Sequence, residues 1–137
     1  MTLLLIAAFS PVSSAASNKK FNFLLRFFDM NEMAFAYHRH CMGGDGGINA
    51  KFLSTMEFVA DALYDESLKT NPSIRPDYIK KKILERRYNI QYKLDKDNLR
   101  NGCQSGDSQT ALAHYNEFSR FSRAQIGDFI VERTQEH

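Results

Sequence analysis

Residues 76–103 read PDYIKKKILERRYNIQYKLDKDNLRNGC, which is the longest stretch of uninterrupted helical periodicity in the chain. At about 100° per residue, its apolar residues fall into two stripes on nearly opposite sides of a helix. The first stripe is Ile79, Ile83, Ile90 and Leu94, and the second is Leu84, Tyr88, Tyr92 and Leu99. A helix that is apolar on two sides is expected to pack on two sides. We therefore expect helix 76–100 to be the central packing element of the fold.

The rest of the sequence predicts further helices. The chain has only seven glycines and three prolines among 137 residues, which leaves long segments suited to helices. Helices are expected at about residues 30–42, 50–69 and 76–100, from residue 107 or 108, and from about residue 123. In the second helix one face is lined by Phe52, Met56, Val59 and Leu63. Ser122 and Gln125 have the residue types of a capping box at the start of the last helix. The predicted fold class is all-α, a small bundle of four to five helices.

Two details of the first helix depend on local signals. Asp29 and Glu32 have the residue types of a capping box, which favours a helix start near Met30. Periodicity alone leaves open whether the apolar residues 21–28 continue this helix or form a separate one. The glycine-rich residues 43–47 are expected to end it and to act as a flexible linker.

The first sixteen residues have the order of a secretory signal. They carry no charge, and an apolar run at Leu3–Phe9 is followed by small residues. Cleavage after Ala15 or Ala16 would leave residues 17–137 as a single helical domain with a polar tail from about residue 132. The alternative is a short hydrophobic helix or an uncleaved anchor, although the run is shorter than the ~20 residues that span a bilayer. We expect a periplasmic or secreted protein with no transmembrane helix in its mature chain.

Two cysteines, Cys41 and Cys103, lie in the predicted mature chain. In an exported protein an even number of cysteines indicates disulfide bonds, and two cysteines allow one connectivity. In an up-down bundle, the C-terminal ends of helices 30–42 and 76–100 meet at the same pole, because the helix between them runs back. We therefore predict a disulfide between Cys41 and Cys103.

Charge is distributed unevenly along the chain. The net charge of +2 argues against a dedicated nucleic-acid binder, which would concentrate positive charge. Residues 29–66 contain seven acids and two bases, whereas residues 75–100 contain nine bases and four acids. Helices 50–69 and 76–100 are joined by a short connection and should be antiparallel neighbours. Their opposite charges are therefore expected to face each other.

The basic residues of helix 76–100 are the candidate binding site for an anion or a partner. They are Lys80, Lys81, Lys82, Arg86 and Arg87. Arg86 projects onto the apolar stripe of Ile79 and Ile90, where a buried guanidinium needs a carboxylate partner. The sequence offers Asp29, Glu57 or Asp61 for this purpose. The alternative is that Arg86 lies in a pocket and binds an anionic ligand.

The sequence contains no convincing catalytic, cofactor or metal motif. The candidate ligands for a metal-dependent protein are His38, His40, Cys41, Cys103 and His114. His38 and His40 point about 160° apart on a helix, and the spacing matches no closed zinc site. Residues 95–98 resemble the opening of a calcium loop, but Arg100 stands where that loop requires glycine. We expect no cofactor, no metal and no enzymatic activity.

The leading functional hypothesis is an exported, non-enzymatic helical protein that acts through protein–protein contact, as a chaperone, an inhibitor or an assembly subunit of the cell envelope. Its partner would be a protein of unknown identity. The second hypothesis is a binding module for an anionic small molecule, a lipid or an anionic membrane surface, which would use Arg86 and the basic face of helix 76–100. A His/Cys metal-dependent protein is the remote alternative.

Overall fold

The computed structural model describes residues 15–43 and 46–135, which form five α-helices and no strand. The helices are α2 (Ala15–Cys41), α3 (Gly46–Thr70), α4 (Pro76–Asn101), α5 (Gly106–Phe118) and α6 (Arg123–Thr134). The all-α class and the small helical bundle are therefore confirmed. Most of the predicted secretory signal, residues 1–14, lies outside the described residues. Within the described residues, no helix is both long and apolar enough to cross a membrane.

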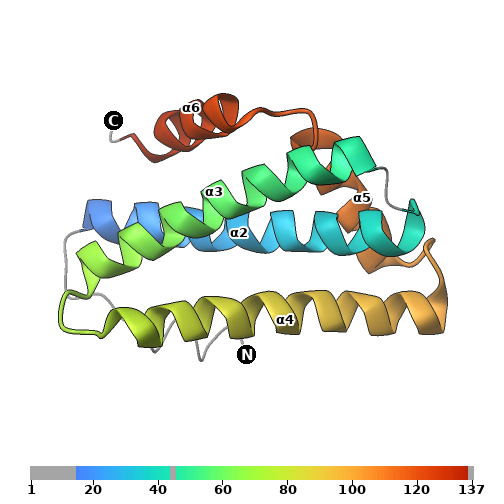
Figure 1. Ribbon diagram of the computed structural model, residues 1–137, viewed down its shortest axis with the longest axis horizontal. Coiled ribbons are helices and arrows are strands. Elements are labelled where there is room, and N and C mark those ends of the chain that lie inside the picture. The colour runs from blue at the N-terminus through green and yellow to red at the C-terminus, as the bar shows by residue number, and fades with distance from the viewer. Residues whose placement is uncertain (1–14, 44–45, 136–137) are drawn as a thin grey trace.

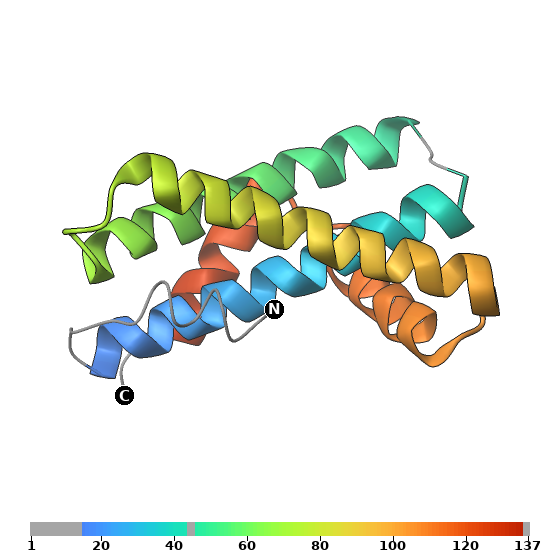
Figure 2. The same cartoon turned by 90° about the horizontal axis from the view of Figure 1, so that it is seen from below.

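The centre of the bundle is α2, not α4. Helix α2 packs against each of the other four helices, and α3 and α4 also contact each other (Figure 1 and Figure 2). The reason lies in its sequence, because apolar residues occur all around this helix. Phe21, Leu24, Leu25, Phe27 and Phe28 are each at most 3% exposed. The expectation that helix 76–100 is the central element is therefore wrong.

Helix α2 is also continuous through the segment that the sequence left open. Residues 21–28 belong to the same helix as residues 30–41, so the predicted start near Met30 is wrong. The side chains of Asp29 and Glu32 form ion pairs with arginines of α4, and do not cap a helix start. Their residue types were suited to both roles, and tertiary packing decided between them.

The other helix boundaries follow local signals more closely. Gly43 has a left-handed φ of +73° after the end of α2, whereas Gly46 and Gly47, expected in the linker, form the first turn of α3. Helix α4 begins with Pro76 and is followed by Gly102, whose φ is +75°. Ser122 and Gln125 form the predicted capping box at the start of α6.

The core lies where α3, α4, α5 and α6 meet α2. The predicted inner face of α3 is confirmed, since Phe52, Met56, Val59 and Leu63 are all at most 3% exposed. Helix α4 adds Ile79 and Ile83, and α5 adds Phe118. At the other end of the bundle, a disulfide joins Cys41 at the end of α2 to Cys103 just after α4, with a Cα–Cα distance of 5.9 Å. The predicted disulfide is confirmed.

Candidate interaction surface on α4

The second apolar stripe of α4 lies at the surface. Its four large side chains are 50–83% exposed: Leu84 60%, Tyr88 66%, Tyr92 50% and Leu99 83%. The rings of Tyr88 and Tyr92 stack with centroids 5.7 Å apart. We call these four residues the α4 stripe. The expectation that α4 packs on both of its apolar sides is therefore wrong, because the central position in the bundle belongs to α2 and α4 is an outer helix.

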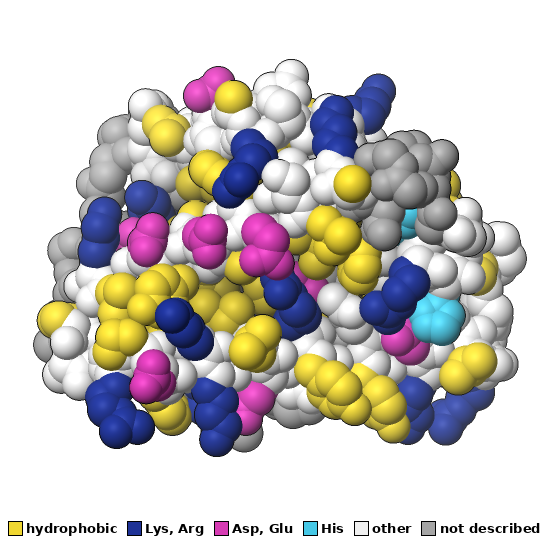
Figure 3. Space-filling model, in the orientation of Figure 1, with side chains coloured by type: hydrophobic (Ala, Val, Ile, Leu, Met, Phe, Trp, Pro, Cys, Tyr) yellow, Lys and Arg dark blue, Asp and Glu magenta, His cyan; other side chains and the backbone are white. Residues whose placement is uncertain are grey.

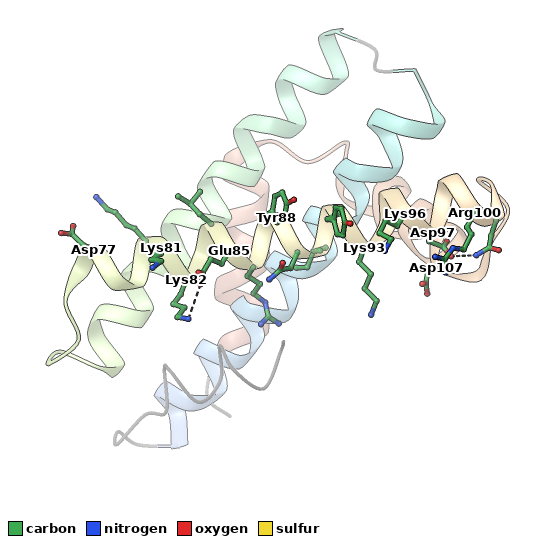
Figure 4. Close-up of a pocket in the computed structure, with 17 residues that line it drawn as sticks. Asp77, Lys81, Lys82, Glu85, Tyr88, Lys93, Lys96, Asp97, Arg100 and Asp107 are labelled. Carbon is green, nitrogen blue, oxygen red and sulfur yellow. Dashed lines mark hydrogen bonds and ion pairs between the residues drawn. The ribbon is translucent and has the colours of Figure 1, made fainter.

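A pocket opens along the outer side of α4 and includes three residues of the α4 stripe. Sixteen of its seventeen described lining residues come from α4 and one, Asp107, comes from α5 (Figure 4). Leu84, Tyr88 and Tyr92 supply apolar surface to it, while lysine and arginine side chains are spread along the length of the helix. Helix α4 is the lowest helix in Figure 1, and its outer side faces the viewer in Figure 2.

Three basic side chains beside the α4 stripe form no ion pair with a described residue. They are Lys93, Lys96 and Arg100. On a helical wheel they fall within about 60° of one another, along one edge of the stripe. The ammonium group of Lys96 lies 5.4 Å from the ring centroid of Tyr92, which brings the charge close to the apolar surface. We call these three residues the basic edge.

The predicted site residues divide into two groups. Arg86 is 7% exposed, and its Nε and Nη2 atoms each donate a hydrogen bond of 2.6 Å to the carboxylate of Asp29. Arg87 donates from Nε to Glu32 at 2.8 Å and lies 3.4 Å from Glu57. Both guanidinium groups are thus engaged inside the bundle. Of the three carboxylates predicted for Arg86, the structure selects Asp29.

The lysines of the predicted site behave differently from the arginines. Lys80 lies over the ring of Tyr64 on α3 at 5.5 Å, and Lys82 pairs with Glu85 at 3.3 Å. Lys81 is exposed and lines the pocket. Four of the five predicted residues, Lys80, Lys81, Lys82 and Arg86, line the same pocket along α4, and Arg87 does not. The three residues of the basic edge, which were not predicted individually from the sequence, lie nearer the C-terminal end of α4.

The predicted pairing of charges between α3 and α4 is only partly observed. Among the described residues, Arg87 and Glu57 form the one ion pair between these helices. The shorter pairs of α4 reach α2 instead, because α4 packs more extensively on α2 than on α3. Figure 3 shows the result: hydrophobic side chains reach the surface between a row of acidic side chains over α3 and basic side chains over α4.

Glu32 is the most buried carboxylate of this network. It is 1% exposed, and its two carboxylate oxygens accept hydrogen bonds from Arg87 and from Nε2 of Gln91, the latter at 2.6 Å. Burial raises the pKa of Glu32 above its ordinary value, and the positive charge of Arg87 opposes this effect. The two hydrogen-bonded donors hold α4 in a fixed position on α2.

The histidines and cysteines of the predicted remote metal site have other surroundings. His38 is buried and stacks on Tyr115, with ring centroids 5.0 Å apart, and His40 lies 3.0 Å from Asp95. Burial lowers the pKa of His114, while the charge of Glu117 opposes that shift. Within the described part of the chain, no group of three or more His, Cys, Asp or Glu side chains is placed to hold a metal ion.

Comparison with known proteins gives no match to a protein-family model, and no significant match to a curated protein or to a solved structure. The function is therefore argued from the geometry of the chain itself. The sequence predicted that the α4 stripe is packed against another helix, and this prediction is wrong. The periodicity of the sequence identifies an apolar face, but it does not show whether another helix covers that face.

Proposed function

We propose that this chain is an exported, non-enzymatic helical protein that acts through protein–protein contact, and that the α4 stripe with its basic edge is the contact surface. The observation that carries this proposal is the exposure of four large apolar side chains along one side of a single helix. Contiguous apolar surface of this kind is typical of interaction sites in soluble proteins. Tyrosine is also among the residues enriched at protein interfaces.

The attachment of α4 to α2 supports this role. The ion pairs of Arg86 and Arg87 fix the middle of α4, and the Cys41–Cys103 disulfide fixes its C-terminal end. A surface that is already rigid loses little conformational freedom when it binds. The α4 stripe is therefore presented to a partner without the need to order a flexible segment first.

The chemistry of the surface suggests a helix as the partner. Leu84, Tyr88 and Tyr92 are spaced four residues apart, so they form a ridge of the type that packs into the groove of another helix. The basic edge lies along one side of this ridge. An amphipathic helix with an apolar face and acidic residues beside it would complement both features. A chaperone, an inhibitor or an envelope assembly subunit could each use such a contact.

The expected location is the periplasm or the exterior of the cell. The Cys41–Cys103 disulfide supports it, because structural disulfides persist mainly in oxidising compartments. The apolar N-terminal residues 3–9 support it as well.

Site-specific photocrosslinking tests this proposal. A photoreactive amino acid is placed at position 88 on α4 and, as a matched control, at the exposed position Asn116 on α5. We expect a discrete protein adduct from position 88 that is absent from position 116. The adduct should disappear when Lys93→Glu and Lys96→Glu are introduced together, and the crosslinked peptide of the partner should be helical with acidic residues beside the contact.

Two results would overturn the proposal. One is a crosslink from position 88 to lipid alone, accompanied by binding to vesicles that contain anionic phospholipid. This result would assign α4 to a membrane surface. The other is the same set of adducts from positions 88 and 116, which would mean that α4 has no preferred partner.

A further inference from the structure

A second pocket lies where α5 and α6 meet α2, away from the α4 stripe. Four of its lining residues come from α2, at the helical spacing i, i+3, i+4 and i+7, and the others come from the two C-terminal helices. They are Phe23, Arg26, Phe27, Met30, Glu117, Phe118, Phe129 and Arg133. We propose that this pocket binds a small monocarboxylate with an apolar or aromatic body. The proposal is independent of the function proposed for α4.

The wall of the pocket is a cluster of phenylalanine rings. The ring of Phe27 lies 4.8 Å from that of Phe118 and 5.3 Å from that of Phe129, measured between centroids. Phe23 lies 6.0 Å from Phe129. Phe27 and Phe118 are 2% exposed and form part of the core, whereas Phe23 and Phe129 are only partly buried. The exposed parts of these two rings offer apolar contact surface to the body of a ligand.

Two guanidinium groups supply the positive charge of this pocket. The Arg133 guanidinium lies 4.8 Å from the centroid of Phe129, so stacking holds it against the apolar wall. Arg26 is exposed on α2. Neither arginine forms an ion pair with a described residue, in contrast to Arg86 and Arg87. Arginine is well suited to this task, because its planar donors match the geometry of a carboxylate.

Glu117 is the one acidic residue among the described residues that line the pocket. With Arg26 and Arg133 it leaves a net charge of +1. This balance fits a ligand with one negative charge, and the negative charge of Glu117 disfavours a phosphate dianion. The apolar wall disfavours a small hydrophilic anion, which would lose its hydration without gaining apolar contacts. A carboxylate on a hydrocarbon or phenyl body satisfies both parts of the pocket.

This pocket is distinct from the anion site that the sequence predicts on α4. That prediction uses Arg86, whose Nε and Nη2 donors bind Asp29, together with the basic face of helix 76–100. Arg26 and Arg133 lie 107 residues apart in the chain, and no short motif connects them. The three-helix junction brings both to one aromatic pocket.

Isothermal titration with 3-phenylpropionate tests the proposal, with 3-phenylpropanol as a neutral probe of the same shape. We expect saturable binding of the carboxylate and at least about tenfold weaker binding of the alcohol. The Arg26→Gln/Arg133→Gln variant should lose about tenfold or more in affinity for the carboxylate. The control is Arg123→Gln, because Arg123 also lies over a phenylalanine ring, Phe58 at 5.5 Å, but outside the pocket.

A third variant should change the affinity for 3-phenylpropionate in the opposite direction. Glu117→Gln removes the negative charge of the pocket and should strengthen binding of 3-phenylpropionate by about twofold to tenfold. Circular dichroism spectra and urea midpoints establish that each variant is folded. Three results would each overturn the proposal. They are equal affinity for the acid and the alcohol, no saturable binding of the acid, and full retention of affinity in Arg26→Gln/Arg133→Gln.

Discussion

The guanidinium of Arg86 and the carboxylate of Asp29 are joined by two hydrogen bonds of 2.6 Å, across 57 residues of sequence. This pair links the middle of α4 to the middle of α2. Arg86 lies on the inner side of α4 with Ile79, Ile83 and Leu94, and the α4 stripe on the opposite side faces solvent. The pair and the buried apolar residues of α4 together attach the inner side of this helix to the bundle.

Removal of Arg86 alone should destabilise the fold. In Arg86→Met the carboxylate of Asp29, which is 28% exposed, loses its partner. We expect the free energy of unfolding to fall by about 2–3 kcal/mol, less than for a fully buried pair because solvent screens Asp29. Urea denaturation measures it. Adding Asp29→Leu should restore most of the loss, and Lys93→Met is the control. A loss that the second substitution does not reduce would contradict a direct pair.

The Cys41–Cys103 disulfide closes a loop with a sequence separation of 62 residues. In the chain-entropy model, a loop of this length contributes about 4 kcal/mol by restricting the unfolded chain. Mass spectrometry of the protein after alkylation should find no free thiol. The Cys41→Ser/Cys103→Ser variant should unfold at a lower urea concentration, by an amount that matches this free energy. Two alkylated cysteines in the untreated protein would contradict the assignment.

Glu32 should give the stability of the protein a specific dependence on pH. Its pKa is raised by burial above the ordinary value of 4.5, so the folded state holds the proton more tightly than the unfolded state. Its contribution is fully present below pH 4.5 and is lost as the pH rises through the raised pKa. Relative to Glu32→Gln, the free energy of unfolding of the wild-type protein should therefore fall as the pH rises from 4.5 through the raised pKa of Glu32. The control is Glu132→Gln, on an exposed side of α6.

Urea denaturation at a series of pH values measures this difference in the free energy of unfolding between the wild type and Glu32→Gln. A difference between wild type and Glu32→Gln that stays constant from pH 4 upward would mean that Arg87 and Gln91 fully compensate the burial of Glu32.

Much of the fold could be predicted from the sequence because several signals are local. The spacing of three and four residues between Phe52, Met56, Val59 and Leu63 predicted the buried side of α3. Ser122 with Gln125 predicted the start of α6. The disulfide followed from the order of the helices. These features depend on a few neighbouring residues or on topology, and the structure confirms each of them.

The misassigned features depend on packing between distant segments. The sequence of α4 shows two apolar sides but cannot show that α2, with apolar residues all around, takes the central position. Asp29 and Glu32 look like a helix start, and their true partners are more than 50 residues away. Arg26 and Arg133 meet at one pocket only because α6 folds back onto α2. No local pattern contains this information.

The basic edge should act mainly on the rate of association with a partner. Lys93→Glu/Lys96→Glu reverses two charges beside the α4 stripe, and Lys19→Glu/Lys69→Glu is a control with the same change in net charge on α2 and α3. We expect the first variant to reduce the association rate about tenfold or more at low salt, with a smaller effect at high salt. Surface plasmon resonance with the crosslinked partner measures it. Equal effects of both variants would indicate nonspecific attraction.

The most direct test compares partner affinity and stability in one variant, Tyr88→Ser/Tyr92→Ser. Both rings are at least 50% exposed, so their removal should change the free energy of unfolding by less than about 0.5 kcal/mol. The affinity for the crosslinked partner should fall at least tenfold, because exposed tyrosines at an interface carry much of the binding energy. Leu53→Ser on α3, where Leu53 is 40% exposed, should leave the affinity unchanged. Unchanged affinity in the double variant, or its unfolding under native conditions, would contradict the assignment of the α4 stripe as the contact surface.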